Sequence, residues 1–323
     1  MDYEAFIAEW NSSSDCVMVH TSGSTGAPKP LLVEKRRMEA SARITCDFLG
    51  LQRGNTALLC MPLDYIAGKM MVVRAIVRQL QLIRVEPSSH PLATLAGQCI
   101  DFAAMVPMQV VNSLKVPAER ETLRRIKHLI IGGGAIDESL AAALKDFPNA
   151  VWSTYGMTET LSHIALRRLN GPDASEWYTP FERVHVSLDN RGCLVIDAPE
   201  VCAETLVTND RAELRGQQFR ILGRIDNVVD SGGIKIQMEE VEKALKPHLS
   251  DSFIITKKAD AQFGEVVTLL TESHDLEGVE AICEAHLPKY HRPRHIIHVD
   301  AVPLTETGKP ARGKAQEIAN SKH

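Results

Sequence analysis

The hydrophobic and polar positions along the first two thirds of the chain follow two alternating patterns. Short apolar runs of strand length are separated by segments whose apolar residues recur with the spacing of one helix face. The runs predict strands at 16–20, 56–60, 82–85, 128–131 and 150–155, and the segments predict helices at 34–49, 68–80, 108–115 and 137–146. Strands that alternate with helices predict a mostly parallel sheet with helices on both faces.

The helix predicted at 34–49 has the most regular apolar stripe, and Gly50 directly after it is a typical helix stop. The stripe consists of Met38, Ala42, Thr45 and Phe48. We expect these side chains to share one face of the helix.

Beyond about residue 170 the pattern changes. Turn-forming sequences at 171–173 and 189–192 separate short runs with a period of two, which is typical of antiparallel strands. The last third predicts a compact α+β unit, with helices at 238–246 and 276–287 and strands near 252–256, 265–271 and 295–299. We therefore predict an α/β fold with a large domain over 1–224, which includes a small antiparallel part, and a small mobile domain over 225–323.

Composition narrows the class of protein. Apolar residues make up 44% of the chain and charged residues 24%, the usual balance of a globular protein. The formal net charge of −5 argues against a nucleic-acid partner or an anionic membrane surface, because both favour basic proteins. The cysteines are scattered, no leader-like segment begins the chain, and no apolar run approaches membrane-spanning length. We expect a cytoplasmic protein with no membrane partner.

A dense set of hydroxyls and glycines, TSGSTGAPK at 21–29, directly follows the first predicted strand. Backbone N–H groups and hydroxyls at this density form a cradle for phosphate oxygens, and the lysine adds a cation. The residues that we assign to this cradle are Thr21, Ser22, Gly23, Ser24, Thr25, Gly26 and Lys29. The chain lacks the G-x-x-x-x-G-K-[ST], H-E-x-x-H and G-x-S-x-G sequences, which argues against Walker-type nucleotidases, zinc peptidases and α/β-hydrolases.

This loop resembles the phosphate loop of the adenylate-forming superfamily, which includes acyl-CoA synthetases, luciferases and peptide-synthetase adenylation domains. Further segments resemble the motifs of that superfamily in the same order along the chain. They lie at 132–136, 155–160, 207–210, 223–226, 231–235 and 303–309. Asn209 departs from the pattern, because the superfamily usually has glycine before the aspartate. The resemblance implies an enzyme that uses ATP to convert a carboxylic acid into an acyl-adenylate and then into a thioester.

The resemblance also implies roles for individual residues. We expect the nucleotide to contact Gly133, Gly134, Ala135, Tyr155, Gly156, Met157, Asp210 and Arg224. Glu159 would hold Mg²⁺, a hard cation that prefers carboxylate and phosphate oxygens, and Thr158 would donate to the α-phosphate. Lys309 would bridge the attacking carboxylate and the α-phosphate and stabilise the charge that develops there.

A rotation of the C-terminal domain between the two reactions is a further implication of the resemblance. Asp226 would be the hinge, and the rotation would remove Lys309 from the site. It would also bring a loop with Gly232, Gly233 and Lys235 to the thiol of coenzyme A. One site would then serve both reactions while water is kept from the labile adenylate.

Within the superfamily, the chain most resembles the o-succinylbenzoate–CoA ligases of menaquinone biosynthesis, in the segments 106–109, 155–164 and 223–237. A dicarboxylic acid of this kind needs a cation or several hydrogen-bond donors for its distal carboxylate. Our candidates for the acid pocket are Tyr65, Gly68, Lys69, Arg74, Ser162 and His163. Tyr65 stands where those ligases have histidine.

Several alternatives stay open. The substrate could be another aryl or amino acid, the acceptor could be a carrier protein, and the chain could be a non-catalytic nucleotide-binding relative. Twenty residues precede the phosphate loop, where the superfamily has a substantial N-terminal subdomain, but the intact motifs favour a minimal ligase. The assembly state is open, with a homodimer among the alternatives. A zinc site at Cys283 and the histidines that follow it lacks the usual ligand spacing.

Overall fold

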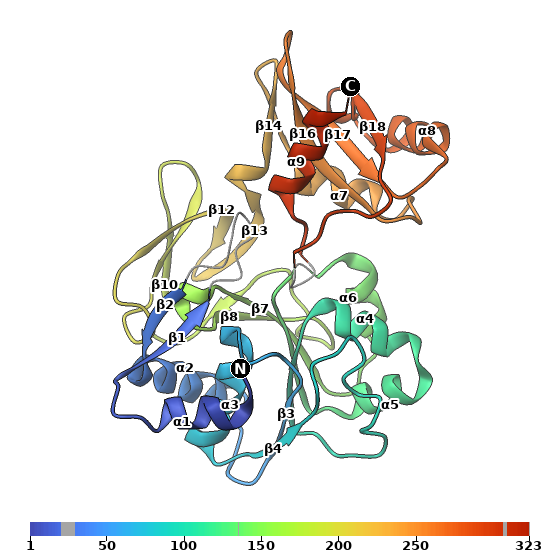
Figure 1. The fold of residues 1–323 in the computed structure, drawn as a ribbon. Coiled ribbons are helices and arrows are strands. Elements are labelled where there is room, and N and C mark those ends of the chain that lie inside the picture. The colour runs from blue at the N-terminus through green and yellow to red at the C-terminus, as the bar shows by residue number, and fades with distance from the viewer. Residues whose placement is uncertain (21–29, 135, 306–308, 323) are drawn as a thin grey trace.

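The computed structural model describes residues 1–20, 30–134, 136–305 and 309–322. The chain forms a larger N-terminal lobe and a smaller C-terminal lobe, which lies above it in Figure 1. Buried apolar residues form one cluster from Phe6 to Phe219 and two smaller clusters between Val229 and Ala319. The predicted boundary at 225 falls between these cores.

A seven-stranded sheet forms the centre of the N-terminal lobe, in the order β4-β3-β5-β6-β7-β8-β9. The first five strands in this order run parallel, and the last two are antiparallel to their neighbours. The strands are β3 (Thr56–Leu59), β4 (Gln81–Arg84), β5 (Phe102–Met105), β6 (His128–Ile131), β7 (Ala150–Gly156), β8 (His163–Arg168) and β9 (Thr179–Pro180). Every residue of β5 is buried, as expected for a central strand that is covered on both faces.

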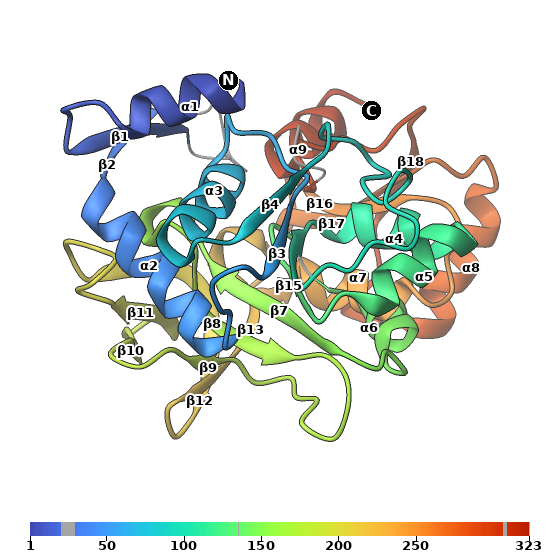
Figure 2. The same ribbon diagram turned by 90° about the horizontal axis from the view of Figure 1, so that it is seen from below.

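Helices cover both faces of this sheet, as Figure 2 shows. One side carries α2 (Lys35–Phe48) and α3 (Ile66–Arg78), and the other carries α4 (Pro107–Lys115), α5 (Pro117–Arg125) and α6 (Glu138–Leu144). Helix α2 ends where predicted, because Gly50 adopts φ +64°, a backbone conformation that glycine tolerates without steric cost.

The predicted stripe of α2 is only partly correct. Met38, Ala42 and Thr45 are buried, but Phe48 is 42% exposed. Phe48 lies in the last turn of the helix, where its ring meets the rings of Trp152 and Phe181 edge-on, with centroids 5.2 and 5.3 Å away. This position leaves one side of the ring in solvent.

The N-terminal helix α1 (Tyr3–Trp10) packs beside a β-hairpin of β1 (Cys16–His20) and β2 (Pro30–Glu34). The side chain of Asp2 caps the helix by accepting from Ala5 N–H at 2.7 Å. Glu9 Oε1 accepts from Met18 N–H at 2.9 Å and ties the helix to β1. The antiparallel part of the lobe is a separate four-stranded sheet of β10 (His185–Leu188), β11 (Cys193–Asp197), β12 (Leu206–Arg215) and β13 (Gln218–Arg224).

The C-terminal lobe follows the short turn η2 (Ile225–Asn227). Its sheet has the order β15-β14-β17-β16, with β18 parallel to β17. The strands are β14 (Val228–Ser231), β15 (Ile234–Gln237), β16 (Phe253–Asp260), β17 (Gly264–Thr271) and β18 (His295–His298). The helices are α7 (Met238–Leu245), α8 (Leu276–His286) and α9 (Arg312–Ser321), and η3 (Lys289–His291) is a short turn.

The predicted fold class is confirmed, and each predicted helix and strand has a counterpart in the structure. The sequence pattern does not predict α1, β2, β5, α5, β8, β9, η1, β12, β13, η2, β14, β15, η3 and α9. Within the described ranges, no helix is both long and apolar enough to cross a membrane.

Candidate active site

A hydrogen-bonded network surrounds Asp210 on β12, close to the point where the lobes meet. Its Oδ2 accepts from the Tyr155 hydroxyl at 2.6 Å, and its Oδ1 accepts from Arg224 Nη1 at 2.9 Å. Arg224 Nη2 also donates to Asp226 Oδ2 at 2.7 Å. Burial and the adjacent charge of Asp210 raise the pKa of Tyr155, so its hydroxyl stays a donor. Three predicted nucleotide residues and the predicted hinge aspartate thus share one network.

Tyr155 also belongs to an aromatic cluster at the end of β7. Its ring centroid lies 5.0 Å from that of Phe219, edge-on, and 5.9 Å from that of Tyr178. Tyr178 stacks in turn on Phe219, with a centroid separation of 5.5 Å. This packing fixes the ring of Tyr155 next to Asp210 and leaves it half-buried.

Gly132 and Gly156, one from each of two predicted motifs, lie where neighbouring atoms leave no room for a side chain. A Cβ at Gly132 would lie 2.3 Å from Thr154 Oγ1, and one at Gly156 would lie 2.2 Å from the carbonyl oxygen of Ser162. Gly133 adopts φ +78°. Ala135, the fourth residue of the 132–136 motif, lies outside the described residues. The ends of β6 and β7 are therefore held against their neighbours at close range.

Glu159 lies in the turn η1 (Thr158–Thr160), with an exposed side chain beside the buried Thr158. Thr160 Oγ1 fixes this turn, because it accepts from Met157 N–H at 3.0 Å and donates to Ser162 O at 2.7 Å. Among the residues that the structure describes, none forms an ion pair or hydrogen bond with the Glu159 carboxylate.

A carboxylate without a described ion pair or hydrogen bond is a suitable ligand for a hard cation such as Mg²⁺. The described parts of the chain contain no group of three or more His, Cys, Asp or Glu side chains that could hold a metal ion. A cation at Glu159 would therefore take most of its ligands from phosphate oxygens and water.

The predicted phosphate cradle, Thr21–Lys29, lies outside the described residues. The residues on either side of it are paired, since His20 and Pro30 are opposite one another in the β1–β2 hairpin. The segment thus connects two adjacent antiparallel strands.

Lys309 comes from the C-terminal lobe and lies within electrostatic range of the Asp210 network. Burial lowers the pKa of Lys309, and the positive charge of Arg224 lowers it further, against the opposing effect of Asp210. Its backbone closes a short loop, in which Lys309 N–H donates to Thr305 Oγ1 at 3.1 Å and Thr305 N–H donates to Lys309 O at 2.8 Å. The fold therefore brings a lysine from one lobe into electrostatic range of Asp210 in the other.

A second polar cluster lies inside the N-terminal lobe, between α2, α3 and β8. Its centre is Arg74, which is only 2% exposed. Arg74 Nη2 donates to Ser162 Oγ at 2.6 Å and to Thr45 Oγ1 at 3.5 Å, while its Nε has no partner. No described carboxylate forms an ion pair with Arg74. Burial lowers the pKa of this guanidinium to about 10, which reflects the cost of a buried cation without a counter-ion.

His163 completes this cluster, and the chemistry of its neighbours fixes its tautomer. Thr45 Oγ1 donates to Ser41 O at 3.1 Å, so it accepts from His163 Nε2, 3.2 Å away. Ser162 Oγ accepts from Arg74, so its hydroxyl donates to His163 Nδ1 at 3.1 Å. Burial, and secondarily the charge of Arg74, lower the pKa of His163 well below its usual value. His163 is therefore a neutral imidazole that orients both hydroxyls around the guanidinium.

Two other predicted acid-pocket residues, Lys69 and Gly68, have their contacts elsewhere. Lys69, also 2% exposed, donates to Met18 O at 2.8 Å and lies 3.5 Å from Glu9 Oε2, so it ties α3 to β1 and α1. Gly68 lies at a close approach of the backbone, because a Cβ there would lie 2.2 Å from Pro62 O. Tyr65 precedes the first turn of α3.

The predicted coenzyme A loop is the tip of the β14–β15 hairpin. Ser231 and Ile234 pair across it, and Gly232 and Gly233 adopt φ +61° and φ +85°. In Figure 1 this hairpin extends away from the N-terminal lobe. In this arrangement of the lobes, Lys309 is near Asp210 and the hairpin tip is not.

Two ion pairs form a second contact between the lobes. Lys246 Nζ lies 2.7 Å from Asp137 Oδ2, and Lys243 Nζ lies 3.0 Å from Glu138 Oε1. Burial opposes ionisation of Asp137, but its hydrogen bonds with Lys246, Ser139 and the N–H of Leu140 lower its pKa to about 2. Asp137 thus caps α6 and binds α7 at once.

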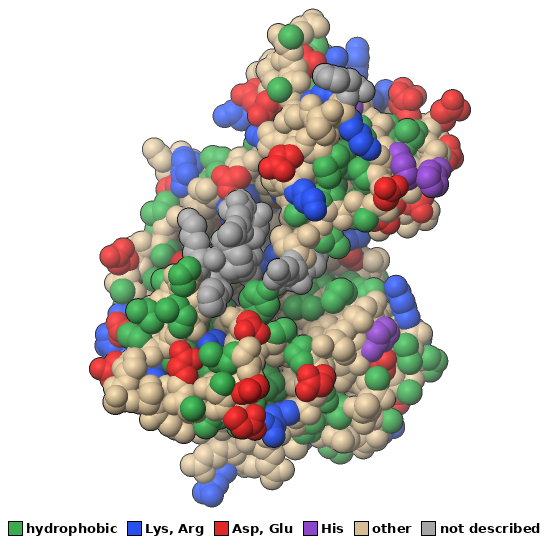
Figure 3. All heavy atoms as spheres, in the orientation of Figure 1, with side chains coloured by type: hydrophobic (Ala, Val, Ile, Leu, Met, Phe, Trp, Pro, Cys, Tyr) green, Lys and Arg blue, Asp and Glu red, His purple; other side chains and the backbone are tan. Residues whose placement is uncertain are grey.

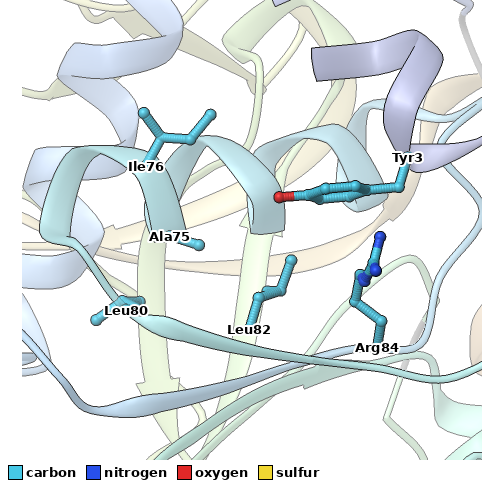
Figure 4. A pocket seen from close by; sticks show the side chains of 6 residues that line it. All are labelled: Tyr3, Ala75, Ile76, Leu80, Leu82 and Arg84. Atoms are coloured by element: carbon cyan, nitrogen blue, oxygen red, sulfur yellow. The ribbon is translucent and has the colours of Figure 1, made fainter.

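A hollow of about 350 Å³ at the sheet edge lies apart from these clusters. It is lined by Tyr3, Ala75, Ile76, Leu80, Leu82 and Arg84, and Figure 4 shows the Arg84 side chain beside the ring of Tyr3. The guanidinium lies 4.3 Å from the ring centroid. The face drawn in Figure 3 intersperses basic and acidic side chains, without a broad basic area.

Some residues of these clusters are absent from our sequence-based candidates. Thr45, Tyr178 and Phe219 each contact a predicted site residue. Thr45 carries a usable signal, because it is a hydroxyl in an otherwise apolar stripe of α2. The two aromatic residues carry no signal, since only the tertiary fold brings Tyr178, just before β9, and Phe219 of β13 to β7.

The chain is similar in sequence to proteins named 2-succinylbenzoate–CoA ligase over most of its length. It is 25% identical over 350 residues to the 2-succinylbenzoate–CoA ligase of Enterococcus faecalis, covering 97% of this chain and 71% of that protein. It is 26% identical over 307 residues to the 2-succinylbenzoate–CoA ligase of Escherichia coli, covering 90% of this chain and 66% of that protein. The chain thus spans about two thirds of the length of these relatives.

Solved structures resemble the fold as well. An acyl-CoA synthetase (AMP-forming)/AMP-acid ligase II-like protein from Dyadobacter fermentans is 35% identical, with a TM-score of 0.66, over 97% of this chain and 92% of that one. The o-succinylbenzoate CoA synthetase of Bacillus subtilis, solved with its acyl-adenylate intermediate, is 20% identical, with a TM-score of 0.78, over 92% of this chain and 68% of that one. The sequence profile of AMP-binding enzymes matches residues 4–200. The chain belongs to the AMP-binding enzyme family.

Proposed function

We propose that this chain is an ATP-dependent acid–CoA ligase that forms an acyl-adenylate and then a thioester. The observation that carries the proposal is the position of Lys309, which comes from the C-terminal lobe and lies within electrostatic range of Asp210 and Arg224 of the N-terminal lobe. A half-buried lysine at a lobe boundary, with a lowered pKa and no described ion pair, is a candidate for a group that acts on a bound ligand.

In the first reaction, a carboxylate oxygen of the acid attacks the α-phosphorus of ATP, and the bond to the β-phosphate oxygen breaks to release pyrophosphate. Asp210 holds the ribose and the ring of Tyr155 lies against the adenine, while the 132–134 backbone forms the edge of the base pocket. The ammonium of Lys309 stabilises negative charge on the attacking carboxylate and the α-phosphate. Glu159 would hold Mg²⁺, which would supply positive charge to neutralise the phosphate groups.

In the second reaction, the thiol of coenzyme A attacks the acyl carbonyl and AMP leaves. The hairpin tip with Gly232, Gly233 and Lys235 lies away from Asp210 in the present arrangement, so this step requires the C-terminal lobe to turn about η2. The turn withdraws Lys309 after adenylation, when its charge is no longer needed. Separate lobe cores on either side of η2 support such a rigid rotation.

The acid that fits the N-terminal lobe best carries a second carboxylate. Arg74 is a buried cation whose described hydrogen-bond partners are neutral, and its Nε is unpaired. A substrate carboxylate would supply the missing counter-ion in a geometry that guanidinium favours. Together with the two 2-succinylbenzoate–CoA ligase relatives, this favours o-succinylbenzoate, an aromatic dicarboxylic acid, and hence a role in menaquinone biosynthesis.

An acid panel tests the proposal. The purified chain is given ATP, Mg²⁺ and coenzyme A together with one acid from a panel. The panel contains o-succinylbenzoate, the methyl ester of its aliphatic carboxylate, benzoate and a fatty acid, and the products are identified by mass spectrometry. We expect pyrophosphate, AMP and a CoA thioester, with o-succinylbenzoate turned over faster than the monocarboxylates. Preference for benzoate or the ester would reject the dicarboxylate assignment. ATP binding without pyrophosphate release for any acid would make the chain a non-catalytic relative.

A further inference from the structure

Asn209 links the two lobes through a side-chain amide whose orientation is unambiguous. Its Oδ1 accepts from Arg191 Nη1 at 3.1 Å, and its Nδ2 donates to Asp226 Oδ1 at 3.0 Å and to Asp226 Oδ2 at 3.3 Å. Arginine can only donate and an ionised carboxylate can only accept, so a flipped amide would lose all three bonds. The glycine that usually occupies this position in the superfamily would form none of them.

Both partners of Asn209 are themselves anchored. Arg191 donates to Asp189 Oδ2 at 2.7 Å and to Thr208 O at 3.0 Å, which fixes it on the β10–β11 turn of the N-terminal lobe. Asp226 lies in η2, the turn through which the chain passes from one lobe core to the other. Asn209 therefore ties the connecting turn to a rigid part of the N-terminal lobe.

The link continues into the candidate active site. Arg224 bonds both Asp226 and Asp210, and Asp210 also accepts from Tyr155. Lys309 lies in the electrostatic field of Arg224 and Asp210. A change in the backbone of Asp226 would break its bonds with Asn209 and Arg224 together. Lys309 belongs to the lobe that follows this turn, so a reorientation of the turn would also move Lys309.

We propose that Asn209 is a positioning residue that holds the η2 turn in the arrangement with Lys309 beside Asp210, and so favours acid activation over the thioester step. This inference rests on the proposed function for its effect on catalysis, but its effect on the turn does not depend on any activity. The Asp226 carboxylate is 40% exposed, so solvent weakens the link. We expect its loss to change the balance of the two arrangements by about 3- to 10-fold, as for one hydrogen bond to a partly solvated charge.

Three variants separate this role from a general effect on the turn. Asn209→Ala removes the amide, and Asn209→Asp keeps its shape while placing a second negative charge against Asp226. Asn227→Ala is the matched control, because Asn227 also lies in η2 but donates to Glu239 at 2.5 Å within the C-terminal lobe. Urea unfolding of each variant establishes that it is folded.

Hydrogen exchange of the peptide that spans residues 225–231 gives the readout that is independent of activity. We expect exchange about 3- to 10-fold faster in Asn209→Ala, faster still in Asn209→Asp, and within about 2-fold of the parent in Asn227→Ala. Parent-like exchange in both Asn209 variants, or an equal acceleration in Asn227→Ala, would overturn the inference.

The half-reactions give the second readout. In Asn209→Ala the ratio of adenylation rate to thioester formation from preformed acyl-adenylate should fall about 3- to 10-fold. An unchanged ratio in an active enzyme would also overturn the inference. If the parent chain catalyses neither half-reaction, the proposed function fails, and the exchange experiment alone decides whether Asn209 holds the turn.

Discussion

Replacement of Arg74 by methionine should make the protein bind a dicarboxylic acid less well without making it less stable. Arg74 is a fully buried cation, and the lowering of its pKa from 12.5 to about 10 corresponds to about 3 kcal/mol of unfavourable free energy for the charged form. Methionine has a similar length and no charge. Against this gain stand two lost hydrogen bonds, to Ser162 and Thr45, worth about 1 kcal/mol each. The free energy of unfolding of Arg74→Met should therefore be unchanged or up to about 2 kcal/mol higher.

The effect on the acid should have the opposite sign. A charge-assisted contact between guanidinium and carboxylate contributes about 1.5–3 kcal/mol, which corresponds to a KM for o-succinylbenzoate that is about 10- to 150-fold higher in Arg74→Met. The KM for ATP should stay within about 3-fold, since the nucleotide lies against other residues. Pyrophosphate release measured at varied acid and at varied ATP gives both constants, and urea unfolding without ligands gives the stability.

Lys69→Met is the matched control, because Lys69 is an equally buried cation on the same helix. Its ammonium bonds Met18 O and lies near Glu9, so its loss should destabilise the fold by about 1–2 kcal/mol and leave the KM for the acid nearly unchanged. The reasoning is refuted if Arg74→Met binds o-succinylbenzoate as the parent does. It is refuted equally if both variants raise the KM for the acid by the same factor.

Four further outcomes follow from the geometry. Lys309→Ala should slow adenylation about 10²- to 10³-fold but form thioester from preformed acyl-adenylate at nearly the parent rate; equal losses in both would make the residue structural. In the parent, adenylation should decline as rising pH passes the lowered pKa of Lys309, below the usual 10.5, which a pH–rate profile checks. The Asp137–Lys246 contact is fully present above about pH 4 and is lost as the pH falls through about 2. The variant Asp137→Asn still caps α6 but lacks this titrating carboxylate. Its free energy of unfolding, measured with urea, should therefore fall less across that pH window than that of the parent. Phe6→Ala, at a fully buried position of α1, should lower the free energy of unfolding by about 3–5 kcal/mol, and a change below about 1 kcal/mol in urea unfolding would mean that α1 is not part of the core.

The sequence pattern predicts those helices and strands in which apolar residues recur at a regular spacing. Helix α2 shows the spacing of one buried face and a glycine stop, and both features are present in the structure. Strand β5 is a short buried run in which apolar and polar residues do not alternate. Strand β12 contains charged residues, and the neighbouring strands determine which of its faces is polar. Their conformation depends on partners that are distant in sequence, which a local pattern does not contain.

In the candidate site, too, some residue positions could be predicted from the sequence and others only from the fold. The resemblance to the superfamily's motifs places Tyr155, Asp210 and Arg224 in one site, and the structure joins them by hydrogen bonds. For the acid pocket, sequence offers both Lys69 and Arg74, but residues five apart on a helix point about 140° away from each other, so they cannot serve the same pocket. Which of them faces the N-terminal helix depends on how α1 and β1 pack on α3, and only the fold supplies that information.

The fate of the carboxylate oxygen tests the central claim most directly. The chain is incubated with ATP, Mg²⁺, coenzyme A and o-succinylbenzoate carrying ¹⁸O in its carboxylates, and AMP and inorganic phosphate are analysed by mass spectrometry. Attack of the carboxylate on the α-phosphorus, followed by thiol attack on the acyl carbon, leaves one carboxylate oxygen on the phosphate of AMP. We predict AMP that is heavier by one ¹⁸O and no ¹⁸O-labelled inorganic phosphate, because the β- and γ-phosphates leave together as pyrophosphate. Label in inorganic phosphate with ADP as the nucleotide product, or thioester formed with unlabelled AMP, would contradict an acyl-adenylate intermediate.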